Sequence, residues 1–314
     1  MSALSLGRLI VARENMRDHP GEGSTSRGSA LADWSELPGV PSAPQASESG
    51  PVRARHLGAR VVRYLRNAVS ASPLALLLAA VLHSHAAVGA PLNVEAARDR
   101  MVQTIETLAK GVQLPSGRQE IDASILAAMR QVPRHELVPE SVRNEAYEDR
   151  PLPIGHGQTI SQPYIVALMT QLARPAKHHV VLEVGTGSGY QAAVLSPLVA
   201  KVFSIEIVEP LARQAGNRLR ALGFENVSVR HGDGYKGWPE HGPFDSIVVT
   251  AGASHVPAPL VEQLKPGGRM VIPVGGAAAV QYLTLIEKDE AGRVHTRSLL
   301  PVRFVPLTGE NTRQ

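Results

Sequence analysis

The stretch VLEVGTGSGYQAAV, residues 181–194, decides the fold of this 314-residue chain. An apolar run contains Glu183 near its end, Gly185, Gly187 and Gly189 alternate with small residues, and a segment suited to a helix follows. A strand that passes through a glycine loop into a helix is the ligand-binding turn of open parallel sheets. The stretch therefore predicts an α/β fold with a ligand at the end of this strand.

The spacing of the glycines separates two classes of ligand. A dinucleotide loop has the pattern G-x-G-x-x-G, and its last glycine would fall at Tyr190 in this chain. A carboxylate at Glu183, beside the loop, would repel a pyrophosphate and attract a sulfonium or ammonium group. The predicted ligand is therefore a cation without phosphate, which describes S-adenosyl-L-methionine.

Acids at the ends of two later strands extend this cofactor site. In KVFSIEIVE the apolar run ends at Glu206, nineteen residues after Gly187, where an acid can accept both ribose hydroxyls of an adenosine. In HGDGYKGW, Asp233 stands at the turn after the next strand and can receive the adenine amino group. Because open α/β sheets bind ligands at the carboxyl ends of their strands, Glu183, Glu206 and Asp233 are predicted to share one site with the glycines.

Apolar runs alternate with amphipathic segments around this site. Strands are predicted over 179–184, 201–206, 226–230, 244–250 and 268–274, and helices over 190–198, 209–222 and 257–264. After Gly276 the chain has two further strand-like segments, joined by a turn at 290–292, with no helix between them. The fold class is therefore α/β, with a doubly wound, mostly parallel seven-stranded sheet and an antiparallel C-terminal strand pair.

Upstream of the glycine loop, two amphipathic helices are predicted, over 96–110 and from Asp122 to Pro133. Residues 150–158 are rich in Pro and Gly and are predicted to form a loop, which His156 helps to shape. Ser161, followed by Pro163, marks the start of a helix that runs to about residue 173. From the residues alone, Ser161 is equally well interpreted as a helix N-cap and as a functional side chain.

The first 95 residues have a different composition from the predicted domain at 96–314. They are rich in Ser, Pro, Gly and Ala with little periodic apolar pattern, so residues 1–95 are predicted to be a mostly disordered extension. Within it, a short apolar segment at 73–90 follows Arg63 and Arg66 in the order of a secretory signal, and it is too short to span a bilayer. We expect a cytoplasmic protein, with export as the alternative if translation starts later and the 60–90 segment is a signal peptide.

The amino-acid composition of the chain excludes several classes of function. The net charge is +4, but no run of Lys and Arg is interleaved with aromatics, so no nucleic-acid partner is expected. The chain has no cysteine, which excludes disulfides, thiolate metal sites and a cysteine nucleophile. The histidines show no ligand spacing with acids, and no metal is predicted. Neither an integral membrane association nor an oligomer is expected.

Several stretches together resemble the protein-L-isoaspartate O-methyltransferases, a family of class I methyltransferases with a Rossmann-like fold. They are VPRHELVPE, LPIGHGQTISQPYIVALMTQL, the glycine loop, the segment from VSVRHGDGYKGW to GGRMVIPVG, and VRFVPL, in the family's order over roughly residues 97–308. The glycine loop and LKPGGR are shared by many class I methyltransferases, whereas GQTIS joined to QP before the loop is specific to this family.

The resemblance implies an enzyme that uses S-adenosyl-L-methionine to methylate the free carboxyl of L-isoaspartyl residues in damaged proteins, which initiates their repair. It implies Ser161 as the active-site residue, with Thr159 beside it. A carboxylate is already ionised near neutral pH, so Ser161 is expected to orient the substrate rather than to act as a nucleophile. The alternatives are a class I methyltransferase acting on a small molecule or RNA, and a module that binds the cofactor without turnover.

Overall fold

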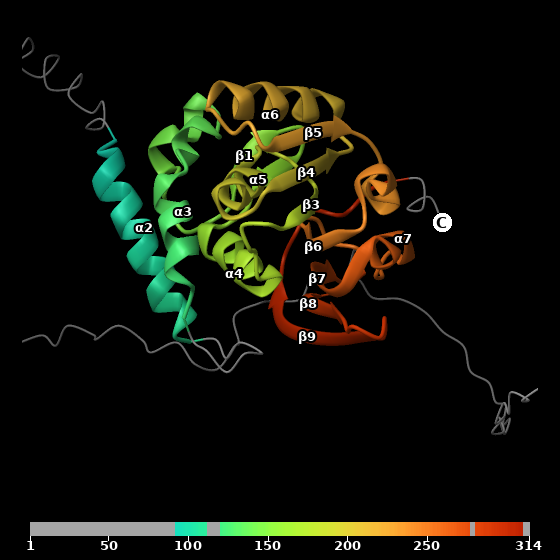
Figure 1. Cartoon of the computed structure of the whole chain (residues 1–314). Helices are drawn as coiled ribbons and strands as arrows, with labels where there is room; N and C mark the ends of the chain where they lie inside the picture. Colours follow the sequence, from blue (N-terminus) through green and yellow to red (C-terminus); the bar gives the residue numbers. More distant parts are fainter. Residues whose placement is uncertain (1–91, 112–119, 277–279, 310–314) are drawn as a thin grey trace, which may run out of the picture. The chain divides into compact units, whose positions relative to one another are not determined.

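The computed structural model describes residues 92–111, 120–276 and 280–309 (Figure 1). The predicted disordered extension, except for its last four residues, and the apolar segment at 73–90 lie outside the described residues. The first described helix begins at Val94, because the side chain of Asn93 accepts the backbone N–H of Ala96 and caps it. No helix in the described ranges combines the length and the apolar character needed to cross a membrane.

A seven-stranded sheet forms the centre of the domain (Figure 1). Its strands are β3 (Val180–Val184), β4 (Lys201–Glu206), β5 (Val227–His231), β6 (Phe244–Val249), β7 (Leu264–Val274), β8 (Gln281–Lys288) and β9 (Val294–Val302). They lie in the order β5-β4-β3-β6-β7-β8-β9, in which the first five are parallel and β8 and β9 are antiparallel to their neighbours. The predicted fold class is confirmed, including the antiparallel C-terminal pair.

Helices cover both faces of the sheet. The helices are α2 (Val94–Ala109), α3 (Ala123–Gln131), α4 (Pro163–Ala173), α5 (Tyr190–Leu195), α6 (Glu209–Ala221) and α7 (Ala258–Glu262). Helices α4, α5 and α6 pack on one face, α2 and α3 form an outer layer over α4, and α7 packs near β7 on the other face (Figure 1). Two layers of helices therefore protect the face on which the glycine loop enters α5.

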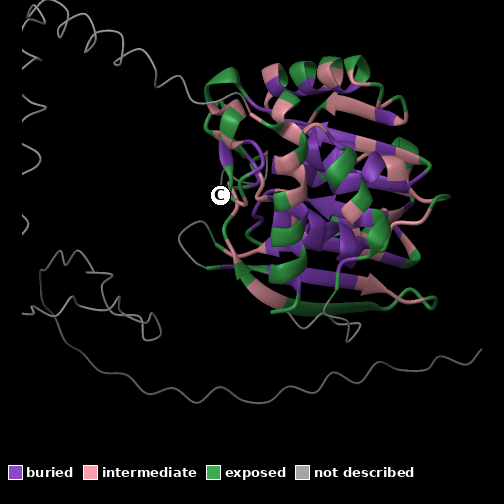
Figure 2. Cartoon of the chain, turned by 90° about the vertical axis from the view of Figure 1, so that its left-hand side faces the viewer, coloured by how far each residue is buried: buried purple, intermediate pink, exposed green. Residues whose placement is uncertain are grey.

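The core follows from the alternation of side chains along buried parallel strands. On β3, Val181 packs with the helices α2 to α5, whereas Leu182 and Val184 pack on the opposite face with β7 and α7. Figure 2 shows the result as buried strands enclosed by helices whose outer surfaces are exposed. Because both faces are covered, the central strands are largely apolar, with Glu183, Ser204 and Ser246 as buried exceptions, which is why their positions could be predicted from sequence.

The predicted loop at 150–158 is in part a β-hairpin, and the prediction of a loop there is wrong for its two arms. Strands β1 (Leu152–Gly155) and β2 (Gln158–Ile160) pair antiparallel. The turn between them has positive φ at Gly155, His156 and Gly157, of 88°, 53° and 69°. Proline and glycine within such short arms concealed the strand pattern, although the turn needs these glycines.

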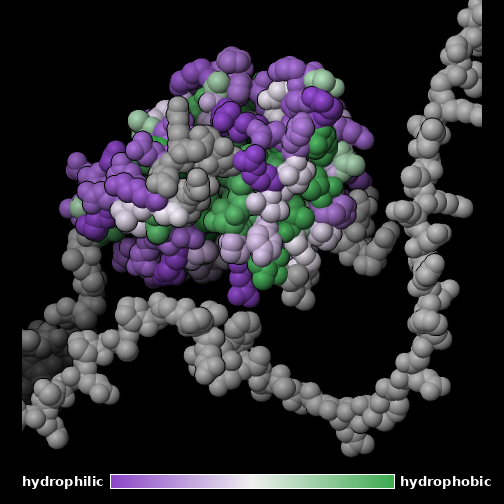
Figure 3. Space-filling model, turned by 90° about the horizontal axis from the view of Figure 1, so that it is seen from below, coloured by the Kyte–Doolittle hydropathy of each residue, from purple (hydrophilic) through white to green (hydrophobic). Residues whose placement is uncertain are grey.

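The edge of the sheet at β9 is partly apolar. Tyr282 of β8 is 46% exposed and Val294 of β9 is 45% exposed. Seen from below, apolar atoms gather between hydrophilic ones on this side of the domain (Figure 3).

Candidate active site

The principal pocket lies at the carboxyl ends of β3, β4 and β6. The chain runs from β3 outward to β4 and β5 and then returns to β6 on the other side of β3, so the pocket sits where the strand order reverses. Its lining comes from the β2–α4 segment, the glycine loop, the ends of β4 and β6 and the C-terminal segment: Gln158, Thr159, Ile160, Ser161, Val166, Glu183, Val184, Gly185, Thr186, Gly187, Ser188, Tyr190, Gln191, Ile205, Glu206, Ile207, Gly234, Thr250, Ala251, Val305, Pro306, Leu307 and Thr308.

The glycine loop has a backbone that only glycine adopts easily. Gly185, Gly187 and Gly189 have φ values of 96°, 51° and 89°. A Cβ at Gly185 would lie 2.5 Å from Thr250 Oγ1, and one at Gly189 would lie 3.0 Å from a methyl of Leu219. Gly185 and Gly187 line the pocket, whereas Gly189 does not belong to its lining, and Gly185 also has no room for a side chain.

Glu183 is fully buried at the end of β3 and lines the pocket. Ser204 donates to one of its oxygens, and Thr186 Oγ1 lies 2.5 Å from Ser204 Oγ, so a short hydroxyl chain leads to the acid. Burial raises the pKa of Glu183 to about 8, although the bond from Ser204 lowers it. Burial therefore favours the protonated form of this acid near neutral pH.

Glu206 joins the end of β4 to the glycine loop. Its Oε2 accepts the backbone N–H of Gly187 over 2.8 Å, and its Oε1 accepts that of Val208 over 2.9 Å. The side chain lines the pocket and is nearly buried, with 5% exposure. Each carboxylate oxygen has a second lone pair, so both can still accept a ligand hydroxyl.

Asp233 lies just outside the lining of the pocket, whereas the next residue, Gly234, belongs to it. Asp233 Oδ1 accepts the backbone N–H of Tyr235 over 2.9 Å and caps the short 3₁₀ helix at Gly234–Lys236. Gly309 approaches the carboxylate so closely that a Cβ there would overlap Oδ1. The structure thus brings Glu183 and Glu206 together in the pocket and places Asp233 behind its wall, beside the C-terminal segment.

Ser161 and Thr159 lie on the segment that joins β2 to α4. A second pocket opens there, lined by Pro151, Thr159, Ser161, Gln162, Ile165, Thr250, Pro301, Val302, Arg303, Phe304 and Val305. Thr159, Ser161, Thr250 and Val305 line both pockets, so the two meet at these residues. The N-cap interpretation of Ser161 is not what the structure shows, because the N-cap residue of α4 is Gln162.

The C-terminal segment is a part of the site that sequence reasoning missed. Gly252 donates to the carbonyl of Val305 over 2.8 Å, and Leu307 donates to the carbonyl of Gly252 over 2.7 Å. These bonds hold residues 305–308 beside the loop after β6, where they line the first pocket. The stretch VRFVPL was recognised from sequence only as part of the family resemblance, because nothing in its composition marks it as part of a site.

One further residue of the site, Gln191, carries no sequence signal. Gln191 is buried in the first turn of α5, and its Nε2 donates to Thr170 Oγ1 over 2.8 Å. Thr170 in turn donates to the carbonyl of Val166, so it can only accept from Gln191, and this fixes the orientation of the amide. Among the described residues, neither Gln191 Oε1 nor Glu183 Oε1 has a hydrogen-bond partner. Both residues line the pocket, so Gln191 Oε1 suits a ligand that brings a donor, and Glu183 Oε1, once ionised, suits a positive charge.

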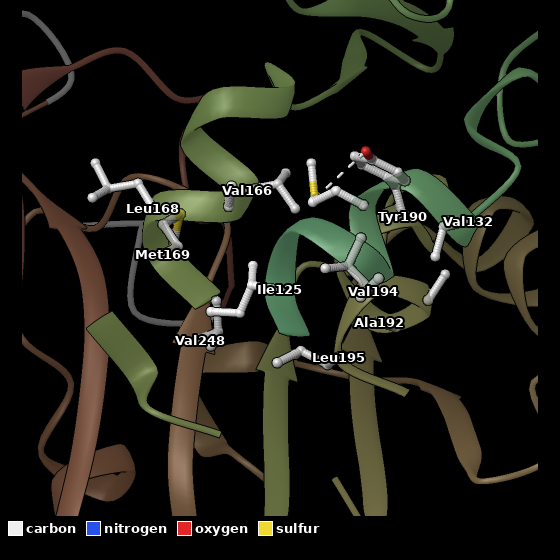
Figure 4. Close-up of a cluster of buried hydrophobic side chains, with 14 of the residues drawn as sticks. Ile125, Val132, Val166, Leu168, Met169, Tyr190, Ala192, Val194, Leu195 and Val248 are labelled. Atoms are coloured by element: carbon white, nitrogen blue, oxygen red, sulfur yellow. Dashed lines mark hydrogen bonds between the residues drawn. The ribbon is translucent and has the colours of Figure 1, made fainter. Parts of the chain in front are cut away.

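Tyr190, the first residue of α5, connects the glycine loop to the helical layer (Figure 4). Its hydroxyl lies 4.0 Å from the sulfur of Met101 and 3.8 Å from that of Met129, and burial raises its pKa to about 12. The guanidinium of Arg134 lies 4.5 Å from the centre of its ring. Arg134 is fully buried, and burial lowers its pKa to about 10, so it remains a cation.

Within the described part of the chain, no group of three or more His, Asp or Glu side chains is arranged to hold a metal ion. His178 and His179 contact each other edge to face and no acid completes a ligand set with them. The pocket therefore offers buried oxygen acceptors and backbone N–H groups. Ser161 lies where this pocket meets the second one.

Known proteins share both the sequence and this architecture. The family model of protein-L-isoaspartate(D-aspartate) O-methyltransferases matches residues 113–312. Protein-L-isoaspartate O-methyltransferase 2 of Syntrophobacter fumaroxidans is 60% identical over 214 residues, which cover 68% of this chain and 87% of that protein. A solved protein-L-isoaspartate O-methyltransferase structure superposes with a TM-score of 0.59 at 31% identity, covering 68% of this chain and 66% of its own.

A second solved structure adds a ligand to the comparison. It is a Plasmodium falciparum protein described as a protein-L-isoaspartate O-methyltransferase, in complex with S-adenosyl-L-homocysteine. It superposes with a TM-score of 0.54 at 25% identity, covering 67% of this chain and 97% of its own. From the match of the family model and the identity to the Syntrophobacter protein, this chain belongs to the protein-L-isoaspartate(D-aspartate) O-methyltransferase family.

Proposed function

We propose that the glycine-loop pocket of this enzyme holds S-adenosyl-L-methionine and that the second pocket presents the isoaspartyl carboxyl of a damaged protein to it. The activity is that of its family, the transfer of a methyl group to the free carboxyl of L-isoaspartyl residues, which initiates repair. This assignment of the two pockets rests on the observation that they meet. Thr159, Ser161, Thr250 and Val305 line both, so a carboxylate in one pocket can reach a ligand in the other.

The residues at the junction suit a reaction that needs alignment more than acid–base chemistry. When bound, S-adenosyl-L-methionine supplies a methyl group on a cationic sulfur, which leaves as a neutral thioether. A carboxylate is ionised near neutral pH and attacks without a base. The hydroxyl of Ser161, with Thr159 beside it, donates to the carboxylate oxygen that does not attack, and so orients the other one.

The cofactor is assigned to the residues around the glycine loop. Gly185, Gly187 and Gly189 allow its close approach, and Glu206 accepts its ribose hydroxyls with the lone pairs left free by Gly187 and Val208. Glu183 and Gln191 offer their unpartnered oxygens to its positively charged part. The adenine amino group is assigned to the end of β5, where Asp233 receives it after a small shift of Gly309.

Charge at the second pocket favours an acidic substrate. Arg303 is the cationic side chain among the residues that line it, and it is exposed. An exposed arginine attracts a carboxylate weakly in water, so it steers the peptide rather than fixing it. The remaining lining is largely apolar and uncharged, which removes water from the reacting carboxylate.

The test of this function is methyl transfer from labelled S-adenosyl-L-methionine to an isoaspartyl peptide and to its aspartyl twin. Only the isoaspartyl peptide should be labelled, and transfer to RNA or to small carboxylic acids at a similar rate would contradict the assignment. Ser161→Ala should lower kcat by about 10- to 100-fold while binding of S-adenosyl-L-homocysteine by calorimetry is unchanged. Ser254→Ala removes another serine hydroxyl, on the loop after β6, and should leave kcat unchanged. Full activity of Ser161→Ala would remove Ser161 from the mechanism.

Compartment and assembly are part of the same proposal. We place the enzyme in the cytoplasm, where its methyl donor is made, and assign it as a monomer. Mass spectrometry of the native N-terminus tests the compartment, since a start beyond residue 60 followed by cleavage near Ala90 would indicate export. Light scattering of the purified enzyme tests the monomer.

A further inference from the structure

The helix that follows Ser161 is capped by a residue from another part of the chain. Helix α4 begins at Pro163, which has no N–H, and its N-cap residue Gln162 makes no capping bond with its own side chain. The first backbone donor of the helix is Tyr164, and it donates to Asp149 Oδ1 over 2.8 Å. Asp149 therefore performs the capping that a residue next to the helix normally performs.

The same carboxylate holds the residue after Ser161. Gln162 Nε2 donates to Asp149 Oδ2 over 2.7 Å. One side chain thus fixes both residue 162 and residue 164, immediately downstream of Ser161. The hydroxyl of Ser161 makes no hydrogen bond within the described ranges, and the residue lines both pockets.

The segment that carries Asp149 is held by the buried guanidinium of Arg134, which binds backbone carbonyls on either side of it. Arg134 Nε donates to the carbonyl of Ala146 over 2.6 Å, and its Nη2 lies 3.4 Å from the carbonyl of Arg150. The guanidinium packs over the ring of Tyr190, which lines the glycine-loop pocket. The segment that carries Asp149 is therefore attached to the wall of the first pocket.

We propose that Asp149 is a positioning residue of the methyl transfer, which sets the place of Ser161 by holding the start of α4. The proposal rests on the role of Ser161 proposed above. Asp149 lines neither pocket and acts only through residues 162 and 164. Its loss lets the β2–α4 segment shift, and a displacement of about 1 Å at a group that aligns a substrate can cost 100-fold in rate.

A double-mutant cycle tests the link to Ser161. In full-length enzyme at a temperature where every variant is folded, Asp149→Ala should lower kcat about 10- to 100-fold, with binding of S-adenosyl-L-homocysteine within about twofold. In the Ser161→Ala background the same substitution should lower kcat less than about threefold, because its partner is already gone. Equal losses in both backgrounds would overturn the proposal.

A conservative variant of Asp149 distinguishes the effect of its hydrogen bonds to the start of α4 from the effect of its negative charge. Asp149→Asn keeps an acceptor for Tyr164 N–H, and its amide can donate to a flipped Gln162, so kcat should stay within about threefold of wild type. If Asp149→Ala does not fold, a loss of kcat in Asp149→Asn as large as that of Ser161→Ala overturns the proposal. Asp289→Ala is the matched control, since Asp289 accepts the N–H groups of Ala291 and Arg293 in the remote β8–β9 turn and should leave kcat unchanged.

Amide hydrogen exchange gives a readout that does not depend on activity. In Asp149→Ala the N–H of Tyr164 should exchange at least about tenfold faster, whereas Asp149→Asn should retain its protection. Unchanged protection in Asp149→Ala overturns the proposal. If wild-type enzyme does not methylate the isoaspartyl peptide, the proposed function fails, and the exchange measurement still decides whether Asp149 holds this segment.

Discussion

Gly187 donates its backbone N–H to Glu206 Oε2 over 2.8 Å, so the acid at the end of β4 supports the loop that follows β3. From sequence, Glu206 was expected only to bind a ligand. In the structure the same carboxylate also accepts Val208 N–H and lines the pocket. The residue therefore shapes the cofactor loop before any cofactor binds.

This double role predicts a strong effect of Glu206→Ala on cofactor binding. The dissociation constant for S-adenosyl-L-homocysteine, measured by calorimetry, should rise about 10- to 100-fold, because hydrogen bonds to a charged acceptor are lost from both the loop and the ligand. Glu206→Gln keeps one acceptor and should fall between wild type and Glu206→Ala. Glu209→Ala removes an exposed acid in the first turn of α6 and should change nothing. Unchanged binding in Glu206→Ala would exclude Glu206 from the ribose site.

A second prediction concerns the room at Gly185. Both Gly185 and Gly223 have positive φ, 96° and 82°, but a Cβ at Gly185 would lie 2.5 Å from Thr250 Oγ1, whereas one at Gly223 would meet nothing within 4 Å. Gly185→Ala should therefore lower the free energy of unfolding by about 1–3 kcal/mol more than Gly223→Ala in chemical denaturation. Equal losses would mean that backbone strain alone, and not contact with Thr250, requires glycine here.

The fold could be predicted because the same sequence pattern, a short apolar strand followed by a helix, recurs along the chain. Most residues on both faces of the central strands are apolar, so the strand positions and the antiparallel C-terminal pair followed from sequence. The hairpin at Leu152–Ile160 did not, because its arms are only four and three residues long and the first contains Pro153. Short arms are stabilised by their tertiary setting, which a local pattern does not record.

The candidate site was predictable in its positions and not in its hydrogen bonds. Strand ends place Glu183 and Glu206 at one edge of the sheet, as expected from topology. Sequence could not tell that Asp233 caps a 3₁₀ helix, or that Asp149 caps α4 from fifteen residues upstream of Tyr164. Such bonds depend on how loops fold back, and a single aspartate in a loop carries no periodic signal.

The third prediction follows from the burial of Glu183, which raises its pKa from 4.5 to about 8. Between these values the folded protein holds a proton that the unfolded chain has released, so the free energy of unfolding falls as the pH rises through this window. Below pH 4.5 the acid is protonated in both states, so its contribution to the free energy of unfolding is fully present. Above about pH 8 it is ionised in both states, so the free energy of unfolding does not change further with pH through this group. Glu183→Gln does not titrate, so its stability relative to wild type should grow with pH by at most about 1.4 kcal/mol per unit. Denaturation at pH values of about 5, 7 and 9 measures this difference.

The proton on Glu183 also provides a test of whether the positive charge of the cofactor binds beside this side chain. A cation that binds beside Glu183 favours the ionised acid, so binding of S-adenosyl-L-methionine near neutral pH should release part of a proton. Calorimetry in two buffers with different heats of ionisation measures this release, which should disappear in Glu183→Gln. S-adenosyl-L-homocysteine has an uncharged sulfur and should release less, which separates the sulfonium from the ammonium group that both compounds carry. Equal binding heats in the two buffers for wild type would show that Glu183 keeps its proton and that its role is a neutral hydrogen bond.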